Sequence, residues 1–455
     1  MTAGTAADPG VPALALTGAL ELDAAALTEY VTRAEAPLAS LPSRPDRTPA
    51  QQHRVGQALT QARTARRRFL ARHVDSVYDM LTDDRSRHLR LAGLLSAAAY
   101  RFPGLVPDPA RMAAEAALPQ SDRDGGEVDQ AVFCAAVFRS PVAGRHLIDA
   151  MLRPAPGSAG LLAEFRRTGR LVLPTVLLDR VGEAGQVTFR NVHCLNAEDN
   201  RLTADLETAV DLVLLDDRVR VGVLRGGEMT HPRYRGRRVF SAGINLKSLR
   251  SGEISFVDFL LGRELGYLNK IVRGLLVDPH EAAWSDRTVQ KPWIGVVDSF
   301  AIGGGMQLLL VLDRVIAEPD AYFSLPAADE GIIPGLGNLR LTRLTGARLA
   351  RRIILGGHRV EADSAEGLLL CDEVVPQCGM DGAVERAVRE LSAPAVVANR
   401  RMLLLAEEPL DRYREYLAEF AVAQVARAYS ADVLAKVERR WSAARSTTGN
   451  RAVRR

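Results

Sequence analysis

The segment that decides the fold runs from Ile294 to Asn338 and reads IGVVDSFAIGGGMQLLLVLDRVIAEPDAYFSLPAADEGIIPGLGN. It opens with an apolar run, Ile294 to Val297, whose length suits a buried strand. A turn follows at Gly303-Gly304-Gly305, and the apolar segment from Met306 to Val311 can begin a helix. Glycines at a strand-to-helix junction leave backbone N–H groups bare and let a ligand or another segment come close. By itself, a GGG turn is more often explained by tight packing of a helix on a strand.

A second glycine turn, FSAGINL at residues 240–246, lies upstream and also follows a strand-like segment. Two turns that each offer an N–H group can hold one carbonyl oxygen from two sides, which is the arrangement called an oxyanion hole. The pair of turns therefore indicates a catalytic site more strongly than either turn alone.

The composition describes a globular protein that can bury a core. The chain has 455 residues, enough for two or three domains, and is 47% hydrophobic and 25% charged. No apolar run approaches the roughly 18 residues of a membrane span, and the first residues lack the basic leader and apolar core of a secretory signal. We therefore expect a cytoplasmic protein without a membrane partner.

Charge and motif spacing exclude several classes of function. The net charge is +4, but aromatic residues make up only 5%, too few for the stacking that nucleic-acid binding favours. The histidines show no metal-binding spacing, and no GxGxxG follows a strand, so neither a metal nor a nucleotide redox cofactor is predicted. The cysteines lack CxxC spacing and are predicted to be buried thiols: Cys134, Cys194, Cys371 and Cys378.

Helical periodicity dominates the first part of the chain, from about residue 13 to residue 180. Phe69 to Leu81, for example, places apolar residues at the spacing of one helical face. No catalytic motif occurs there, so residues 1–184 are predicted to form a helical cap or oligomerisation domain. Strand-like alternation at 171–178 and 187–192 predicts the start of a sheet, with a domain boundary near 182–185. Residues 185–393 would then form the core and 394–455 a set of C-terminal helices.

Two further segments carry charges that need an explanation. Ser255 to Leu276 reads as one long helix that contains Arg263, which either points inward to a carboxylate or ligand or is simply solvated. The segment from 225 to 238, RGGEMTHPRYRGRR, is either a solvated basic loop or a site for phosphates, for which arginine forks are suited.

FSAGINL, then AIGGGMQLLLVLDRVIA and FSLPAADEGIIPGLGN, together resemble the crotonase (enoyl-CoA hydratase/isomerase) superfamily over residues 186–441. The resemblance implies an α/β fold with a ββα spiral core, and C-terminal helices that assemble a homotrimer or a hexamer. It also implies that the N–H groups of Ile244 and Gly304 hold a thioester carbonyl and stabilise an enolate.

Two departures from the superfamily pattern decide which reaction is expected. Hydratases use two glutamates to activate water, and this chain has Gln307 and Ala327 at the matching positions. An amide and a methyl group cannot accept a proton near neutral pH, so hydration is not expected. Asp329 and Glu330 keep open an acyl-CoA isomerase, since isomerases place their acid in other loops.

Within the superfamily, the chain is most similar to cofactor-independent oxygenases of glycopeptide-antibiotic biosynthesis, which share a long helical N-terminal extension. This likeness implies that (3,5-dihydroxyphenyl)acetyl-CoA and O2 are the substrates, that (3,5-dihydroxyphenyl)glyoxylate and free CoA are the products, and that no cofactor is needed. A thioesterase or isomerase on the same scaffold, or a non-enzymatic acyl-CoA-binding protein, remains the alternative.

The resemblance also implies roles for individual residues. Glu198, Arg263 and Gln307 would bind the dihydroxyphenyl ring, and Ile332 would border the oxygen pocket. Without the likeness, Glu198 reads as a plain turn carboxylate. The base that removes the α-proton is not identified, and Glu198 is only a candidate. The remaining substrate contacts are expected at His231, Arg233, Arg237, Ala242, Asn245 and Gly303.

Overall fold

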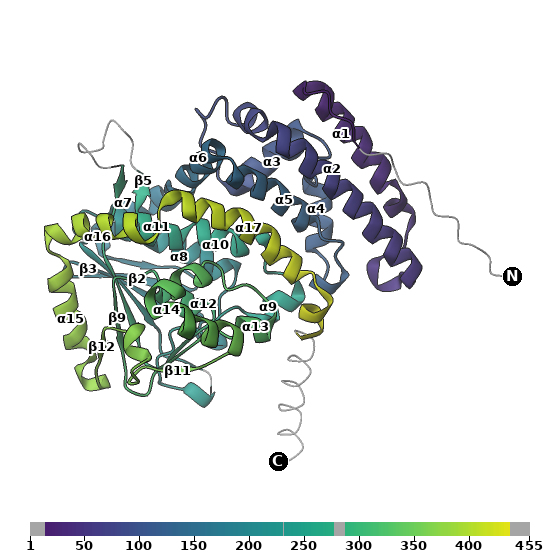
Figure 1. Ribbon diagram of the computed structural model, residues 1–455. Coiled ribbons are helices and arrows are strands. Elements are labelled where there is room, and N and C mark those ends of the chain that lie inside the picture. Colours follow the sequence, from purple (N-terminus) through teal and green to yellow (C-terminus); the bar gives the residue numbers. More distant parts are fainter. Residues whose placement is uncertain (1–13, 231, 277–286, 437–455) are drawn as a thin grey trace, which may run out of the picture. The chain divides into compact units, whose positions relative to one another are not determined.

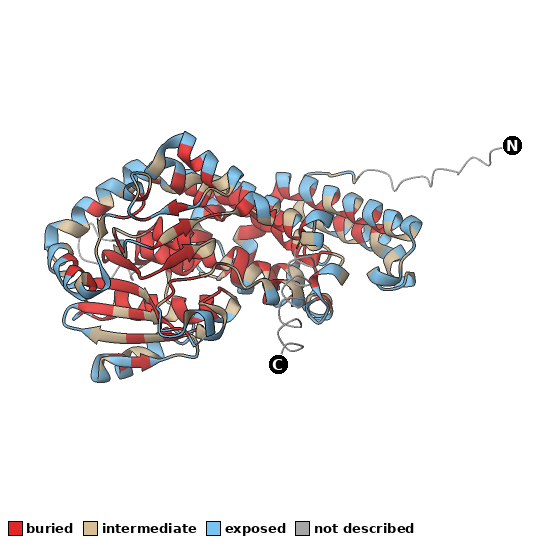
Figure 2. Cartoon of the chain, turned by 90° about the horizontal axis from the view of Figure 1, so that it is seen from below, coloured by how far each residue is buried: buried red, intermediate tan, exposed pale blue. Residues whose placement is uncertain are grey.

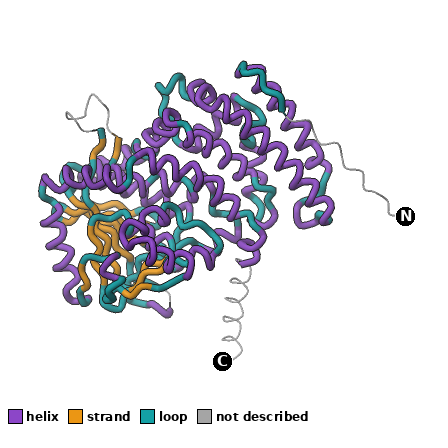
Figure 3. The backbone as a smooth tube through the Cα atoms, in the orientation of Figure 1, coloured by secondary structure: helices purple, strands orange, loops and turns teal. Residues whose placement is uncertain are grey.

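The computed structural model describes residues 14–230, 232–276 and 287–436, which divide into two compact units. The first unit comprises Met1–Leu147 with the short segment Leu417–Val422, and the second comprises the rest of the chain. The first unit is helical, and every strand among the described residues belongs to the second (Figure 1, Figure 3). The predicted boundary near residue 184 is therefore not where the contacts divide the chain.

The helices of the first unit form because apolar residues recur along one face of each segment. α2 opens with a capping box, in which the Gln51 N–H donates to the Thr48 hydroxyl and the Thr48 N–H donates to the Gln51 side chain. Leu70 and Val77 of α2 are buried, as the periodicity predicted, and Phe69 is buried as well. The helices are α1 (Leu20–Glu35), α2 (Pro49–Leu81), α3 (Leu91–Arg101), α4 (Pro109–Ala116), α5 (Gly126–Arg139) and α6 (Pro141–Leu152), which continues into the second unit.

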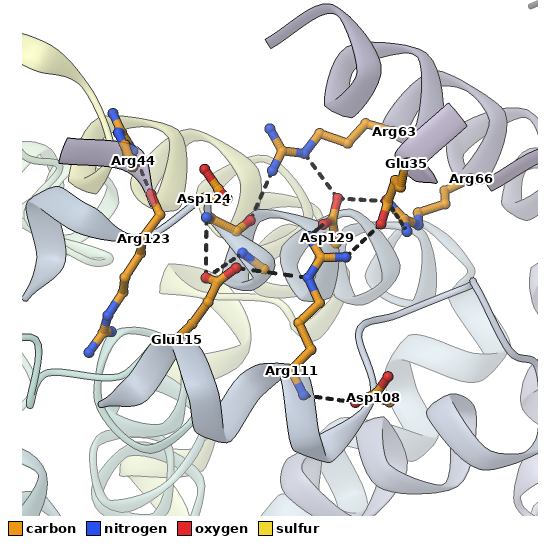
Figure 4. A network of polar contacts seen from close by, with 12 residues as sticks. Glu35, Arg44, Arg63, Arg66, Asp108, Arg111, Glu115, Arg123, Asp124 and Asp129 are labelled. Carbon is orange, nitrogen blue, oxygen red and sulfur yellow. Dashed lines mark hydrogen bonds and ion pairs between the residues drawn. The ribbon is translucent and has the colours of Figure 1, made fainter. Parts of the chain in front are cut away.

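A buried ionic cluster joins the helices of the first unit (Figure 4). Asp129 of α5 is fully buried, accepts a hydrogen bond from Arg63 Nε at 2.9 Å and lies 3.0 Å from Arg66 NH1. Glu35 accepts from Arg66 at 2.8 Å and from Arg111 at 2.7 Å. These contacts tie α1, α2, α4 and α5 together, so the charges are compensated inside the helical unit.

A seven-stranded mixed sheet forms the centre of the second unit, in the order β1-β2-β3-β4-β7-β9-β12. The pairs β1–β2 and β2–β3 are antiparallel, and all later pairs in this sheet are parallel. The strands are β1 (Arg170–Val172), β2 (Val176–Val181), β3 (Ala184–Phe189), β4 (Val221–Gly226), β7 (Trp293–Val297), β9 (Arg314–Ala317) and β12 (Glu373–Val374).

Both faces of this sheet are covered, which explains why its central strands read as continuous apolar runs. In β7, Ile294 and Val296 face α15 (Met380–Leu391), whereas Trp293 and Val297 face a larger cluster that includes α8 (Asn200–Leu215). Trp293 lies against Gly222 of β4, where an added Cβ would come within 2.2 Å of the indole ring. The strands are accordingly among the buried parts of the chain in Figure 2.

Shorter elements complete the second unit. A three-stranded sheet has the order β11-β10-β8, with strands β8 (Phe300–Ile302), β10 (Tyr322–Ser324) and β11 (Val360–Glu361), and a two-stranded sheet pairs β5 (Leu275–Leu276) with β6 (Thr288–Val289). The other helices are α7 (Ser158–Thr168), α9 (Leu246–Ser251), α10 (Gly262–Leu265), α11 (Tyr267–Arg273), α12 (Gly304–Leu309), α13 (Ala327–Glu330), α14 (Gly337–Gly356), α16 (Pro394–Glu407) and α17 (Leu410–Ala428), part of which belongs to the first unit.

The predicted long helix from Ser255 to Leu276 is wrong. It is divided into a π-helical turn, Phe256–Leu260, followed by α10, α11 and β5. Gly266 leaves helical geometry between α10 and α11, and a Cβ there would lie 2.7 Å from the Gly262 carbonyl oxygen. The two glycines therefore permit a break that the apolar periodicity did not reveal.

The C-terminal helices and the cysteine thiols differ in part from expectation. The predicted C-terminal helices, residues 394–455, include α16 and α17, which ends at Ala428, and residues 437–455 lie outside the described ranges. Cys134 and Cys371 are buried thiols, but Cys194 is half-buried and Cys378 is exposed, so the buried-thiol prediction is wrong for these two. Among the described helices, none combines the length and apolar character needed to cross a bilayer.

Candidate active site

The two glycine turns predicted from the sequence lie directly against each other. Ser241 and Ala301 form a parallel bridge, and the Ile302 N–H donates to the Ser241 carbonyl oxygen at 2.9 Å. Gly243 has a φ of +85° and Gly303 a φ of +55°, and a Cβ on Gly243 would lie 3.4 Å from the Gly303 Cα. The close approach and the left-handed backbone explain why glycine is needed on both turns.

One N–H group on each turn has no hydrogen-bond acceptor among the residues that the structure describes. Around Ile244, the Glu198 N–H donates to the Gly243 carbonyl at 2.7 Å, and the Asn245 N–H donates to the Glu198 carbonyl at 2.8 Å. Gly303 donates to the Ser324 carbonyl at 2.8 Å, but Gly304, the first residue of α12, has no such partner. The unfilled donors of Ile244 and Gly304 can together bind an oxyanion.

Glu198 and Arg263 form a buried ion pair beside these donors. Arg263 Nε donates to Glu198 Oε2 at 2.6 Å, and both side chains are at most 5% exposed. Glu198 lies against α12, because a Cβ on Gly304 would come within 2.5 Å of Glu198 Oε1. Asp199 caps α8 immediately after Glu198, which fixes the direction of this turn. The structure thus places Glu198 next to the glycine turn and does not leave it as a solvated turn carboxylate.

Arg263 is satisfied at every nitrogen. Besides Glu198, its guanidinium donates to the Gly304 carbonyl oxygen at 2.7 Å, to Gln307 Oε1 at 3.2 Å and to Glu264 Oε1 at 3.0 Å. Burial favours the neutral form, but the charge of Glu198 outweighs it and raises the pKa of Arg263 above its ordinary value. Arg263 therefore stays charged and holds α12 and Glu198 together.

The Gln307 amide lies beside Arg263 and can bind a ligand in the same site. Its oxygen is taken by Arg263, which leaves the NH2 group to donate to another acceptor. A Cβ on Gly335 would lie 2.7 Å from Gln307 Oε1, so the loop around Gly335 approaches the amide closely. Ala327 is buried at the start of α13, and its methyl group adds no proton acceptor.

Sequence reasoning missed two residues of this site, Glu264 and Tyr267. Glu264 is 2% exposed, and burial raises its pKa against the opposing charges of Arg263 and Arg340. The Arg263 guanidinium lies 5.6 Å from the centre of the buried Tyr267 ring, and burial raises the Tyr267 pKa well above 10. Both follow Arg263 closely in sequence, but a continuous helix would have turned Glu264 away from it.

The remaining predicted residues have contacts of a more ordinary kind. The Asn245 side chain accepts hydrogen bonds from the N–H groups of Lys247 and Ser248 and so caps α9. The Ala242 N–H donates to the Leu195 carbonyl at 3.0 Å, and the N–H of half-buried Ile332 donates to the Ala327 carbonyl at 3.0 Å. These backbone bonds stabilise the turns that flank the unfilled donors.

Two arginines of the basic segment have contacts that do not by themselves indicate phosphate binding. Arg237 pairs with Asp320 at 3.1 Å with both side chains at least half exposed, and the Arg233 guanidinium lies 5.4 Å from the centre of the Tyr234 ring. His231 lies outside the described residues. Coenzyme A contacts by these residues stay a prediction.

No group of three or more His, Cys, Asp or Glu side chains in the described ranges is arranged to hold a metal ion. The site contains the two backbone donors and, beside them, the buried group of Glu198, Arg263, Glu264 and Gln307.

Comparison with known proteins agrees with this geometry. A family model described as enoyl-CoA hydratase/isomerase matches residues 182–411. The (3,5-dihydroxyphenyl)acetyl-CoA 1,2-dioxygenase of Amycolatopsis orientalis is 54% identical over 416 residues, which cover 91% of this chain and 95% of that protein. A probable enoyl-CoA hydratase of Rhizobium meliloti is 31% identical, over 53% of this chain and 82% of its own length.

A solved structure shows the same fold over part of the chain. The enoyl-CoA hydratase/isomerase from Xanthobacter autotrophicus Py2 superposes with a TM-score of 0.50 at 22% sequence identity. The superposition covers 62% of this chain and 99% of that protein. The match to the Amycolatopsis relative covers 91% of this chain, so it also includes most of the helical first unit.

Proposed function

The chain belongs to the enoyl-CoA hydratase/isomerase family, as its two glycine turns predicted, and we propose that it is a (3,5-dihydroxyphenyl)acetyl-CoA 1,2-dioxygenase. One observation carries the proposal. The match to the Amycolatopsis dioxygenase extends over 91% of the chain, whereas the match to the Rhizobium hydratase is limited to 53%. The proposed reaction consumes the thioester and O2 and yields (3,5-dihydroxyphenyl)glyoxylate and free CoA.

The site geometry supports formation of an enolate. The unfilled N–H groups of Ile244 and Gly304 would hold the thioester carbonyl oxygen, and a donor of this kind contributes about 3 kcal/mol to transition-state stabilisation. The α-carbon of an arylacetyl thioester is acidified by both the carbonyl group and the ring. Loss of its proton therefore gives a carbanion that the oxyanion donors stabilise.

The residues that replace the hydratase carboxylates support reaction with oxygen over hydration. Gln307 and Ala327 provide no base that could activate water, so hydration does not compete with the reaction of the enolate with oxygen. The carbanion reduces O2 and binds it as a peroxide at the α-carbon. The peroxide attacks the thioester carbonyl and expels the CoA thiolate. Loss of the second α-proton with O–O cleavage then leaves one oxygen atom in the ketone and the other in the carboxylate.

The buried polar group beside the turns supports an aromatic substrate with hydroxyl groups. Glu198 is paired with Arg263 and its oxygens can accept hydrogen bonds from phenols, while the NH2 group of Gln307 can donate one. Ile332 would border the space for O2, and His231, Arg233 and Arg237 would contact the phosphates of CoA. No metal or organic cofactor is part of this proposal, because the substrate itself supplies the electrons.

An oxygen-uptake assay tests the proposal. The protein is incubated with (3,5-dihydroxyphenyl)acetyl-CoA in air and under nitrogen, each with and without a chelator. We expect glyoxylate and free CoA in air only, unaffected by the chelator, with two labelled oxygen atoms in the product when ¹⁸O2 is supplied. Free arylacetate without oxygen uptake would instead identify a thioesterase, and chelator-sensitive turnover would exclude the cofactor-independent route.

Exposed apolar side chains support self-association of the second unit, and we propose a homotrimer or a hexamer. Met402, Leu403 and Leu405 of α16 are each at least 59% exposed, and Leu368 is 59% exposed in a different segment. Light scattering coupled to size-exclusion chromatography measures the mass directly. A monomer at micromolar concentration would contradict the proposal.

Because acyl-CoA substrates are made inside cells, we propose the cytoplasm as the location.

A further inference from the structure

A row of buried charges continues beyond Arg263, away from the glycine turns. Glu264 Oε2 lies 3.6 Å from Arg340 NH1, and Arg340 forms a two-point ion pair with Glu408 at 3.0 and 3.1 Å. The Glu264, Arg340 and Glu408 side chains are no more than 2% exposed. Solvent therefore screens these charges little, and each depends on its neighbours for compensation.

Glu264 is also fixed by its surroundings. Its carbonyl oxygen accepts a hydrogen bond from the Tyr413 hydroxyl of α17 at 2.8 Å. Gly335 packs against its carboxylate, where a Cβ would lie 2.1 Å from Oε1, and the Gly335 carbonyl accepts from the Tyr416 hydroxyl at 2.8 Å. Two tyrosines of α17 thus hold both α10 and the loop that encloses the carboxylate.

The position of Glu264 determines what Arg263 can do. Arg263 lies between two carboxylates, Glu198 on the side of the glycine turns and Glu264 on the side of Arg340. Loss of the Glu264 charge would remove one of the two anions that face Arg263, while Arg340 would keep its ion pair with Glu408. The guanidinium would then be held less firmly on the Glu264 side, so its orientation toward Glu198 and the Gly304 carbonyl would be less sharply fixed.

We propose that Glu264 is a positioning residue for recognition of the hydroxylated ring. It fixes Arg263 so that Glu198 and Gln307 present their remaining polar atoms to the ring hydroxyls. The inference rests on the proposed function for the identity of the substrate. It goes beyond that function because Glu264 acts through Arg263 and touches neither the thioester nor the ring.

Glu264→Gln tests the proposal, since it keeps the size of the side chain and removes its charge. Oxygen uptake is measured with (3,5-dihydroxyphenyl)acetyl-CoA and with phenylacetyl-CoA, which lacks the hydroxyl groups. We expect kcat for the dihydroxylated substrate to fall by about 10- to 100-fold, as for other indirect partners of functional groups. The preference for this substrate, as a ratio of kcat/KM values, should fall at least tenfold. Glu407→Gln, at an exposed neighbour of Glu408, is the matched control and should change neither value.

A purely structural role for Glu264 predicts a different result. It would lower turnover of both thioesters equally and leave their ratio unchanged, and that outcome overturns the proposal, as does wild-type behaviour. If Glu264→Gln does not fold, Glu264→Asp keeps the charge but withdraws the carboxylate by one methylene. The ratio should fall for this variant too, and a wild-type ratio overturns the proposal.

Failure of the proposed function is distinguishable from failure of this inference. A wild-type protein that takes up no oxygen refutes the dioxygenase reaction alone. The two thioesters are then compared by α-proton exchange in deuterated buffer under nitrogen, which reports the enolate step. A lower exchange ratio in Glu264→Gln than in the wild type supports the positioning role, and an equal ratio overturns it.

Discussion

Buried ionic clusters occur in both units of the molecule, and they are built from the same residue types. In the first unit, Asp129 and Glu35 are compensated by Arg63, Arg66 and Arg111 (Figure 4). In the second unit, Arg263 is enclosed by Glu198 and Glu264. Composition and burial alone do not separate the two clusters.

The difference lies in the backbone beside each cluster. In the first unit, the N–H groups of Gly125 and Gly126 donate to the Glu115 carboxylate, so these backbone donors are not available to a ligand. In the second unit, Arg263 and Glu198 border Gly304, whose N–H has no acceptor in the described part of the chain. Unfilled backbone donors next to a buried ion pair, and not the ion pair itself, therefore indicate the functional site.

The largest effect is expected when the two buried arginines are compared. Arg263→Lys leaves three donors where five are used, so kcat should fall by about a thousandfold. Arg66→Lys in the first unit should lower the melting temperature but leave kcat of the folded protein within about twofold. Steady-state kinetics and thermal unfolding of both variants measure this. An equal loss of kcat in Arg66→Lys would show that the first cluster also serves the reaction.

Removing one charge from the first cluster should affect stability alone. Asp129→Asn keeps the shape of the side chain but leaves Arg63 and Arg66 without their shared anion, at an expected loss of about 3 kcal/mol in the free energy of unfolding. Hydrogen exchange along α2 and α5 would report it. Glu29→Gln, in an exposed pair with Arg33, is the control and should change stability by less than about 0.5 kcal/mol.

Substitution of one glycine in each unit sharpens the contrast further. In Gly304→Ala, the new Cβ would lie 2.5 Å from Glu198 Oε1, which Arg263 prevents from moving freely, so kcat should fall by about a hundredfold. Gly56 of α2 has no atom within 4 Å of its added Cβ. Gly56→Ala should therefore stabilise the protein by about 0.5–1 kcal/mol without changing kcat. Wild-type activity in Gly304→Ala would argue against the proposed oxyanion turn.

A further effect, confined to acid pH, is expected from Glu408. Burial alone would raise the pKa of Glu408, but the charges and hydrogen bonds of Arg340 and the charge of Arg273 outweigh it and lower the pKa from 4.5 to about 2. The stabilisation is therefore complete above the unfolded pKa and is lost as pH falls from about 4.5 towards 2. Denaturant unfolding should show a slope of up to about 1.4 kcal/mol per pH unit in this window. The Glu408→Gln variant should be less stable than the wild type at pH 6. Below pH 4.5 its free energy of unfolding should change less with pH, and a slope equal to that of the wild type would contradict the assignment.

Much of the site could be predicted because its signals are local. The turns at 240–246 and 303–305 are marked by glycine, and the replacement of hydratase carboxylates by Gln307 and Ala327 can be read residue by residue. The helices of the first unit follow from apolar periodicity, and α2 additionally from its capping box. These features depend on neighbours within a few residues.

What the sequence could not reveal depends on contacts between distant segments. Contacts divide the chain after Leu147, ahead of the boundary near residue 184 that the sequence predicted, because α7 packs on β1 and α8 of the second unit. The Glu198–Arg263 pair joins residues 65 positions apart, and no local pattern announces it. Because residues 255–276 were predicted to form a single helix, the burial of both Arg263 and Glu264 was not predicted.

The sequence by itself thus determined the family, the two donor turns and the loss of the water-activating carboxylates. Only the tertiary structure decided how the charged residues surround those turns. Adjacent side chains on a continuous helix point about 100° apart. The spacing of Arg263 and Glu264 therefore does not predict that both are buried in the same network. The breaks permitted by Gly262 and Gly266, together with the packing of α12 and α17, bring the two side chains into the same buried network.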